Sequence, residues 1–249
     1  AARPLRTITA AAARAKPGDA IAVAAGTYTE AVELAAGVTL IGVATDAVVV
    51  ESVTFGIHVS GTLPTTVAQL TVSGGAGSGI VVDQAPVALR RVRVVGVQKK
   101  DKVGGAGVQV MQSPAVLLED CLLEKNAGVG VVIYDSGPAR IANSVQLASP
   151  RQTTGEDGAI DATFVPNSRM SGNFGGGIAV VRSRARSGGG AEFDLTLVAT
   201  DVRANGSAAV ASFGADIKIV RSALRETFEQ NTGSAADGLQ VSVGVEGYE

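Results

Sequence analysis

The chain has 249 residues and a formal net charge of −2, from 21 basic and 23 acidic side chains. This balance excludes the strong positive field that holds a nucleic-acid backbone, and the apolar runs are too short to span a bilayer. We therefore expect neither a nucleic-acid partner nor a membrane span. Hydrophobic residues make up 46% of the chain but aromatic residues only 4%, and there are 32 glycines, which favours short strands around a narrow interior.

The first predicted element is a helix from Ile8 to Ala15. Thr7 is a suitable N-cap residue, and Lys16-Pro17-Gly18-Asp19 ends the helix. Residues 1–19 are expected to cap the N-terminal end of the fold, where unpaired strand groups would otherwise promote aggregation. Residues 20–249 are expected to form the body of the same single domain. Because a new strand begins close to the last residue, we expect the chain to be a fragment of a longer protein.

A repeat runs through the rest of the chain. Each copy has an apolar residue, a small or apolar residue three positions later, an apolar residue five positions later, and often Asn or Gly eight positions later. Clear copies begin at Leu118, Val165 and Leu197, and weaker copies begin at Val67, Leu89, Ile141 and Ile219. Most steps between starts are 22 to 24 residues long, the length of one coil of a solenoid. Loops at 99–105 and 182–191 explain the longer steps.

A second strand precedes most copies, and each begins with a glycine that is expected to supply a tight turn. These glycines are Gly79, Gly107, Gly130, Gly177 and Gly238. If the residue after each glycine points inward, alternation gives two outward rows. The rows are Val81, Gln109, Val132, Ala179 and Gln240, and then Asp83, Met111, Tyr134, Val181 and Ser242. The small or apolar residue three positions after the start of each copy is expected to point inward at a corner. These residues form a predicted column of Val92, Cys121, Ser144, Ser168, Thr200 and Ser222.

These patterns predict an all-β fold, a single-stranded right-handed parallel β-helix. The competing fold is an α/β protein in which the apolar runs alternate with amphipathic helices. We reject it because the gaps between strands rarely offer the ten or so residues that a crossover helix needs. Gly, Ser and Asn also interrupt nearly every gap.

The N-terminal region resembles a known family. The segment Pro4 to Gly42 is similar to the cap and first rungs of the pectin-lyase-like right-handed β-helix repeat proteins, through Lys16-Pro17-Gly18-Asp19, Gly26-Thr27-Tyr28 and Gly37-Val38-Thr39-Leu40-Ile41-Gly42. That superfamily includes polysaccharide lyases, glycoside hydrolases, epimerases, phage tail spikes and surface proteins. The resemblance implies an extracellular or cell-surface location, but the activity has to be argued from a site.

The outward rows argue against catalysis. A lyase of this family needs clustered carboxylates that hold Ca²⁺ together with a basic residue, and a glycoside hydrolase needs a pair of carboxylates. Asp83 is the only carboxylate in the ten outward positions. We therefore expect no cofactor, with Ca²⁺ required only if the chain is a lyase.

The most polar interruption, Arg151 to Asn173, carries the remaining candidates for chemistry. Catalytic candidates are Asp157, Asp161 and Arg169, and binding candidates are Glu156 and Asn167. Loops on a rigid scaffold are common places for sites, but a solvated turn explains these charges more simply. The basic side chains Lys99, Lys100 and Arg184 are candidates for binding an anionic polysaccharide, and solvated loops are again the favoured interpretation.

The outward row predicts an apolar patch of Met111, Val132, Tyr134 and Val181. Monomers usually cover such a patch, so either the 151–173 segment or a partner is expected to lie over it, and we favour the segment. Met111 and Tyr134 are also candidates for binding a ligand there.

The chain has one histidine and one cysteine. His58 is the only histidine; no acidic partner for it is evident, so we expect an exposed or satisfied strand histidine. Cys121 is expected to be buried and unreactive.

The resulting hypothesis is a non-catalytic extracellular or cell-surface β-helix with a structural, adhesive or glycan-binding role. Its partner would be a polysaccharide or another surface protein. The alternative is a polysaccharide lyase or glycoside hydrolase that acts on an acidic polysaccharide. End-to-end self-association is a further expectation, because open solenoid ends can stack.

Overall fold

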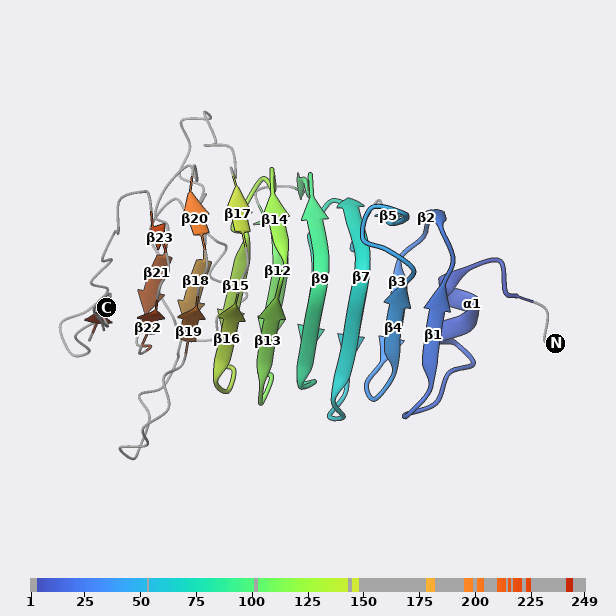
Figure 1. The fold of residues 1–249 in the computed structure, drawn as a ribbon, viewed down its shortest axis with the longest axis horizontal. Helices are drawn as coiled ribbons and strands as arrows, with labels where there is room; N and C mark the ends of the chain where they lie inside the picture. Colours follow the sequence, from blue (N-terminus) through green and yellow to red (C-terminus); the bar gives the residue numbers. More distant parts are fainter. Residues whose placement is uncertain are drawn as a thin grey trace, which may run out of the picture.

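The protein forms a coil of short parallel strands stacked along one long axis, as a computed structural model shows (Figure 1). The structure describes residues 4–52, 54–100, 103–142, 145–147, 178–181, 195–198, 201–203, 210–213, 215, 217–220, 223–224 and 241–243. Each full coil contributes one strand to a first sheet and then two consecutive strand segments to a second sheet. This arrangement is a parallel β-helix, and it confirms the predicted fold class.

The first sheet, called sheet B, contains seven parallel strands. In stacking order they are β3 (Val32–Ala35), β6 (Ile57–Ser60), β8 (Ser78–Asp83), β12 (Ala106–Met111), β15 (Val131–Tyr134), β18 (Ile178–Val181) and β21 (Val210–Phe213). Along β3, β6, β8 and β12 buried and less buried residues alternate, so one face lines the interior and the other faces outward. The predicted inward positions of β8 and β12 are confirmed, since Ile80, Val82, Val108 and Val110 are fully buried.

The second sheet, called sheet A, has two limbs. The first limb contains β1 (Ala20–Val23), β4 (Thr39–Gly42), the first half of β7 (Thr65–Gly74), the first half of β9 (Val87–Val95), β13 (Val116–Glu119), β16 (Ala139–Ala142), β19 (Leu195–Val198), β22 (Ile217–Val220) and β24 (Val241–Val243). The second limb contains β2 (Gly26–Thr29), β5 (Val48–Ser52), the second halves of β7 and β9, β14 (Leu122–Glu124), β17 (Val145–Leu147), β20 (Asp201–Arg203) and β23 (Ala223–Leu224). A small antiparallel hairpin, β10 (Lys99–Lys100) and β11 (Val103–Gly104), projects after β9.

Single residues in the left-handed conformation turn the chain between segments. Between the two limbs they are Gln69, Arg91 and Asp120, with φ of 55°, 51° and 53°. After sheet B they are Gln84, Gln112 and Asp135, with φ of 63°, 51° and 41°. This conformation costs a residue with a side chain about 1–2 kcal/mol. It recurs at the same place in successive coils, so it is part of the corner geometry.

The predicted repeat coincides with a register column in sheet A. Hydrogen-bonded neighbours in this column are Val67, Leu89, Leu118, Ile141, Leu197 and Ile219. Leu89, Leu118 and Leu197 are fully buried, as a core position requires. The corner column is confirmed at Val92 and Cys121, which are 1% and 3% exposed; its members Ser144, Ser168, Thr200 and Ser222 lie outside the described residues.

One predicted coil is wrong. Ile141 pairs directly with Leu197, so the copy that begins at Val165 is not a rung between them. The short pattern matches a segment that connects β17 to β18, and one signal against it was visible. Its leading glycine, Gly158, lies only seven residues before Val165, whereas other copies have ten or more.

The last predicted strand is placed in the wrong sheet. Val241 pairs with Ile217 of β22, so β24 belongs to sheet A. Ser242 therefore does not continue the outward row of sheet B, and Gln240 lies outside the described residues. The strand that does follow β18 in sheet B is β21. Its Val-Ala-Ser-Phe sequence has little apolar alternation and no glycine directly before it, so the pattern missed it.

The leading glycines have a different physical cause from the expected one. Gly79 and Gly107 are not among the residues with positive φ. A Cβ atom on Gly79 would lie 2.8 Å from the carbonyl oxygen of Gly107, and one on Gly107 would lie 2.7 Å from that of Gly130. Stacked backbones approach too closely there for a side chain.

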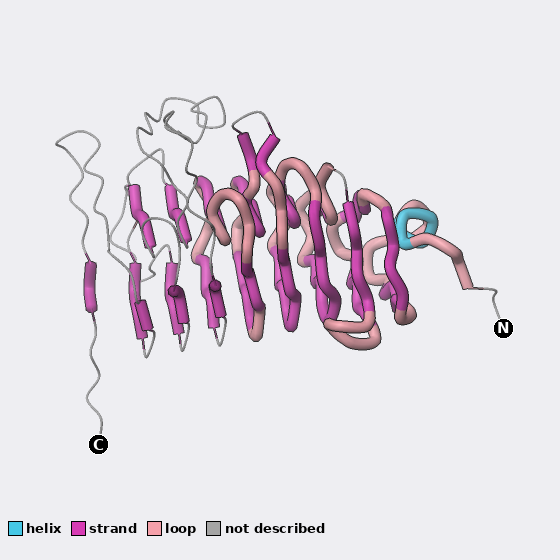
Figure 2. Tube along the Cα trace, turned by 90° about the horizontal axis from the view of Figure 1, so that it is seen from above, coloured by secondary structure: helices cyan, strands magenta, loops and turns pink. Residues whose placement is uncertain are grey.

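The N-terminal helix α1 (Ile8–Ala12) lies at one end of the coil (Figures 1 and 2). Thr7 is its N-cap as predicted and accepts a hydrogen bond from the Ala10 amide at 3.1 Å. The helix ends at Ala12 rather than at Ala15. After it the Arg14 amide donates to Ala11 at a three-residue spacing, and the Ala15 amide is shared between the carbonyls of Ala11 and Ala12. The Glu30 carboxylate accepts from the Ile8 and Thr9 amides at 2.8 and 2.7 Å. No helix among the described residues is long and apolar enough to cross a membrane.

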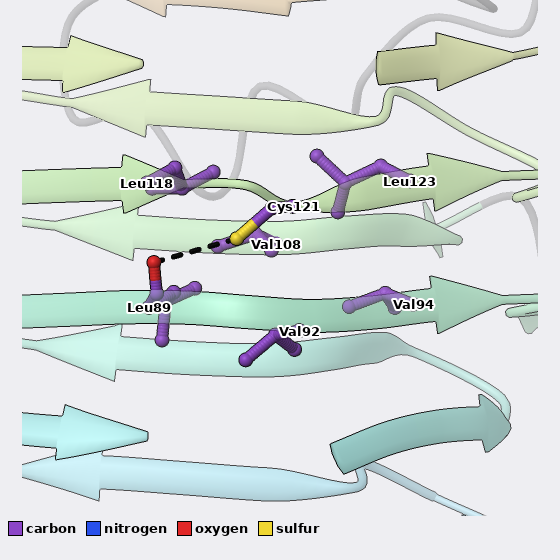
Figure 3. A pocket seen from close by; sticks show the side chains of 7 residues that line it. All are labelled: Leu89, Val92, Val94, Val108, Leu118, Cys121 and Leu123. Carbon is purple, nitrogen blue, oxygen red and sulfur yellow. Dashed lines mark hydrogen bonds between the residues drawn. The ribbon is translucent and has the colours of Figure 1, made fainter. Parts of the chain in front are cut away.

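The interior of the coil is packed with side chains. Figure 3 shows Cys121 among Leu89, Val92, Val94, Val108, Leu118 and Leu123, which point toward one another. The space between these seven side chains has no room for a water molecule. It is a packed core and not a ligand cavity.

The buried Asn126 supplies one prediction. It is fully buried, its Oδ1 accepts a hydrogen bond from the Val97 amide at 3.2 Å, and its Nδ2 donates to the Val94 carbonyl at 3.4 Å. Asn126→Ala removes both of these buried hydrogen bonds and should reduce the free energy of unfolding by about 1–3 kcal/mol. Urea unfolding followed by circular dichroism measures this. Gln98→Ala, which removes an exposed amide from the same turn region, should change it by less than about 0.5 kcal/mol; equal losses would contradict the role given to Asn126.

A second prediction concerns alkaline pH. Burial raises the pKa of the Cys121 thiol from 9.0 to about 11. The unfolded chain therefore loses this proton first, so the thiol's contribution to stability is complete below pH 9 and is lost as the pH rises towards 11. The loss should be on the order of 3 kcal/mol. It is measured as the difference in unfolding free energy between the native chain and Cys121→Ser across this range. Between pH 9 and 11 the unfolding free energy of the native chain should fall more steeply with pH than that of Cys121→Ser. Parallel pH profiles would contradict the raised pKa of Cys121.

Candidate functional site

Polar side chains are concentrated on the outward face of sheet B near its N-terminal end. Here the B face means six of the eight outward residues on four neighbouring strands: Glu33, His58, Ser60, Asp83, Gln109 and Met111. The other two outward residues are the apolar Ala35 and Val81. Strands in a sheet lie about 4.8 Å apart, so these four strands span about 14 Å along the stack. All six side chains are half-buried or exposed, and the rigid sheet holds them in fixed rows.

The closest contact on the B face joins Glu33 to His58. These residues are register partners on β3 and β6, and Oε2 of Glu33 lies 2.7 Å from Nδ1 of His58. Their side chains are 62% and 28% exposed. The ring of Phe55 meets the His58 ring edge-on, with centroids 5.8 Å apart. Because an ionised carboxylate only accepts hydrogen bonds, Nδ1 is the donor in this contact. The second ring nitrogen, Nε2, takes no part in it.

This contact corrects the sequence interpretation, which found no acidic partner for His58. A signal was present: Val32-Glu33-Leu34 has the same apolar, polar, apolar order as Ile57-His58-Val59, at a distance of 25 residues. That distance is close to one coil, so the two polar residues fall on neighbouring strands. The recognisable copies of the repeat begin at Val67, so the predicted register does not extend to these first coils.

The Glu33–His58 pair resembles part of a catalytic arrangement in which a histidine acts as a general base. A carboxylate that orients a histidine ring is one part, and a nucleophile or substrate group on the second ring nitrogen is the other. Within the described part of the chain, Nε2 of His58 has no such hydrogen-bond partner. In the described residues the pair therefore presents one carboxylate and one imidazole on the surface of sheet B.

Asp83 and Gln109 extend the face along the stack. Asp83 is the register partner of Ser60 on one side and of Met111 on the other. Gln109 accepts a hydrogen bond from the Ser78 hydroxyl at 2.8 Å, and its Nε2 lies 3.3 Å from the Met111 sulfur. At the adjoining corner, the exposed amides of Gln84 and Gln112 lie 3.5 Å apart. The contacts with Ser78 and Met111 hold the side-chain amide of Gln109 in one orientation.

The outward face changes character at β15. Tyr134, Ala179 and Val181 occupy outward register positions but are only 9%, 1% and 2% exposed, and Val132 is half-buried. The expected exposed apolar patch is therefore covered at Tyr134 and Val181, and Tyr134 offers little surface to a ligand. The segment expected to cover it, residues 151–173, lies outside the described residues. The accessible polar surface ends near Met111.

The outward face of sheet A carries ion pairs between arginine and glutamate side chains. Arg90 forms an ion pair with its register partner Glu119 at 2.9 Å. Nε of Arg93 donates to Oε1 of Glu124 at 2.8 Å, and the Glu124 side chain is only 11% exposed. These are cross-strand pairs that stabilise neighbouring coils, so the arginines are occupied by structural contacts.

Most other candidate residues cannot be placed. Glu156, Asp157, Asp161, Asn167, Arg169 and Arg184 lie outside the described residues. Lys99 and Lys100 form β10 of the projecting hairpin. In the described ranges no three or more His, Cys, Asp or Glu side chains form a group that could hold a metal ion. The roles suggested for these residues stay predictions.

Two solved structures are similar to this chain. The pectin methylesterase from Yersinia enterocolitica has a TM-score of 0.41 and 11% identity, and the match covers 92% of this chain and 95% of that one. A pectin methylesterase mutant in complex with a hexasaccharide has a TM-score of 0.41 and 10% identity, with 93% and 90% covered. No curated protein matches the chain.

A family model matches most of the sequence. The match runs over residues 1–203, which include the cap, the B face and the strands as far as β20. The description of that family is "Protein of unknown function (DUF1565)". By this match, the chain belongs to the DUF1565 family.

Proposed function

We propose that this protein is a non-catalytic extracellular or cell-surface β-helix that binds a glycan on the B face. The observation that carries this proposal is the set of outward polar side chains on β3, β6, β8 and β12, one or two on each strand. They lie in two neighbouring register rows, with Val81 between His58 and Gln109. Carboxylate, imidazole, hydroxyl and amide groups are donors and acceptors that match the hydroxyl groups of a sugar. Because they recur at the strand spacing, they suit a ligand that itself repeats.

Preorganisation supports a binding role. Glu33 and Gln109 are held by His58 and Ser78 through hydrogen bonds of 2.7 and 2.8 Å. A side chain that is already fixed loses less conformational entropy when a ligand binds. The half-buried side chains of His58 and Met111 add apolar surface beside the polar groups, which suits the C–H faces of a sugar ring.

The alternative of a polysaccharide lyase or glycoside hydrolase has less support from the described residues. Hydrolysis needs two carboxylates that face each other across the scissile bond. On the B face Glu33 and Asp83 lie side by side on strands two apart, and Glu33 is hydrogen-bonded to His58. The catalytic candidates Asp157, Asp161 and Arg169 are not placed. The non-catalytic role therefore stands as the proposal, and a product assay separates the two.

Oligosaccharide binding tests the proposal. His58→Ala and Gln109→Ala should each weaken the binding of an oligosaccharide selected from a broad glycan panel by about tenfold, because each removes hydrogen bonds worth about 1–1.5 kcal/mol. Isothermal titration calorimetry measures the dissociation constants. Thr66→Ala, at a half-buried outward position of sheet A, is the matched control and should leave the affinity within about twofold.

Two results would contradict the proposal. One is affinity that is lost equally in the control or unchanged in both B-face variants. The other is the release of unsaturated products or new reducing ends from any polysaccharide of the panel, which would show an enzyme.

A further inference from the structure

The two outer faces of the coil carry different charges. On the outward positions of β3, β6, β8, β12 and β15 the charged residues are Glu33 and Asp83, and no Lys or Arg occurs there. The outward positions of sheet A carry Arg90, Arg93, Arg140 and Lys218, together with the carboxylates Glu51, Glu119 and Glu124. Among these outward strand positions, the arginine and lysine side chains are therefore segregated to sheet A.

This segregation bears on the charge of a ligand. An acidic glycan on the B face would bring its carboxylates close to Glu33 and Asp83 with no arginine or lysine on these strands to neutralise them. Like charges at contact distance disfavour binding. A glycan with protonated amines would instead form charge-assisted hydrogen bonds, which are about twice as strong as neutral ones.

The surroundings of Asp83 also favour a ligand with protonated amines. Its carboxylate is half-buried between Ser60 and Met111 on the neighbouring strands, and none of the described residues forms an ion pair with it. Glu33 is 62% exposed beyond its contact with His58. Two carboxylates are thus presented two strands apart on one face, among hydroxyl, imidazole and amide groups.

We propose that the glycan bound on the B face is an amino-sugar oligosaccharide with protonated amines, rather than a uronate polymer. This inference rests on the proposed function and names the ligand class of the same site. Amines of the ligand lie against Asp83 and Glu33, while its hydroxyl groups meet Ser60, His58 and Gln109. The length of the accessible face, about 14 Å over four strands, suits a short stretch of the oligosaccharide.

Three hexasaccharides of equal length test the ligand class: a glucosamine oligomer, an N-acetylglucosamine oligomer and a galacturonate oligomer. Isothermal titration calorimetry at low ionic strength should give the glucosamine oligomer an affinity about tenfold above that of the N-acetylated one. The galacturonate oligomer should bind most weakly. Added salt should remove most of the difference between the first two, because screening weakens exposed charge pairs.

Asp83→Asn keeps the shape of the side chain and removes its charge. It should weaken glucosamine-oligomer binding about tenfold and leave N-acetylglucosamine-oligomer binding within about twofold. Glu119→Gln, which removes a carboxylate from the outward face of sheet A, is the matched control and should change neither. Thermal unfolding of both variants checks that they fold.

The outcomes separate this inference from the proposed function. Equal affinities for the three oligomers, or tightest binding of the galacturonate oligomer, would overturn the amino-sugar inference and leave glycan binding in place. No binding of any oligomer, here and across the broad panel, would overturn both. A loss of glucosamine-oligomer affinity in Glu119→Gln equal to that in Asp83→Asn would also overturn the inference.

Discussion

Successive coils of this protein turn their corners through single residues in the left-handed conformation, which bend the backbone while the parallel hydrogen bonds continue on either side. Gln69, Arg91 and Asp120 do this between the two limbs of sheet A, all with φ between 51° and 55°. The same conformation in successive coils keeps the strands in register, so inward side chains such as Leu89 and Leu118 stack directly on one another. Without stacked corners neither the core nor the outward rows would exist.

The fixed register also organises the surface. Because outward side chains stack as strictly as inward ones, a row of polar residues on neighbouring strands becomes a continuous face. Glu33 and His58 meet for this reason, although 25 residues separate them in the chain. The same rule pairs Arg90 with Glu119 on the other sheet. One backbone constraint thus produces the polar B face on one side and a structural set of ion pairs on the other.

The sequence carries the parts of the fold that depend on periodic burial. The column from Val67 to Ile219, the inward corner at Cys121 and the N-cap Thr7 could all be predicted, since each reflects a local chemical requirement. The false copy at Val165 shows the limit, because four matching residues in nine do not establish that a segment pairs with its neighbours. The partner of His58 was missed because it depends on registering the first coils, where the repeat is least marked. The strand β21 was missed because its small residues lack a pattern.

The connection between β17 and β18 has a consequence for engineering. Residues 148–177 connect these two strands, whereas only residues 125–130 connect β14 to β15 in the previous coil. Ile133 and Val180, and Ile141 and Leu197, remain direct register neighbours. The scaffold therefore accommodates 24 additional residues at this junction, 30 minus 6, without a change of register. A foreign loop or epitope grafted at this position would be displayed from a rigid rod whose coils on both sides keep their own alignment.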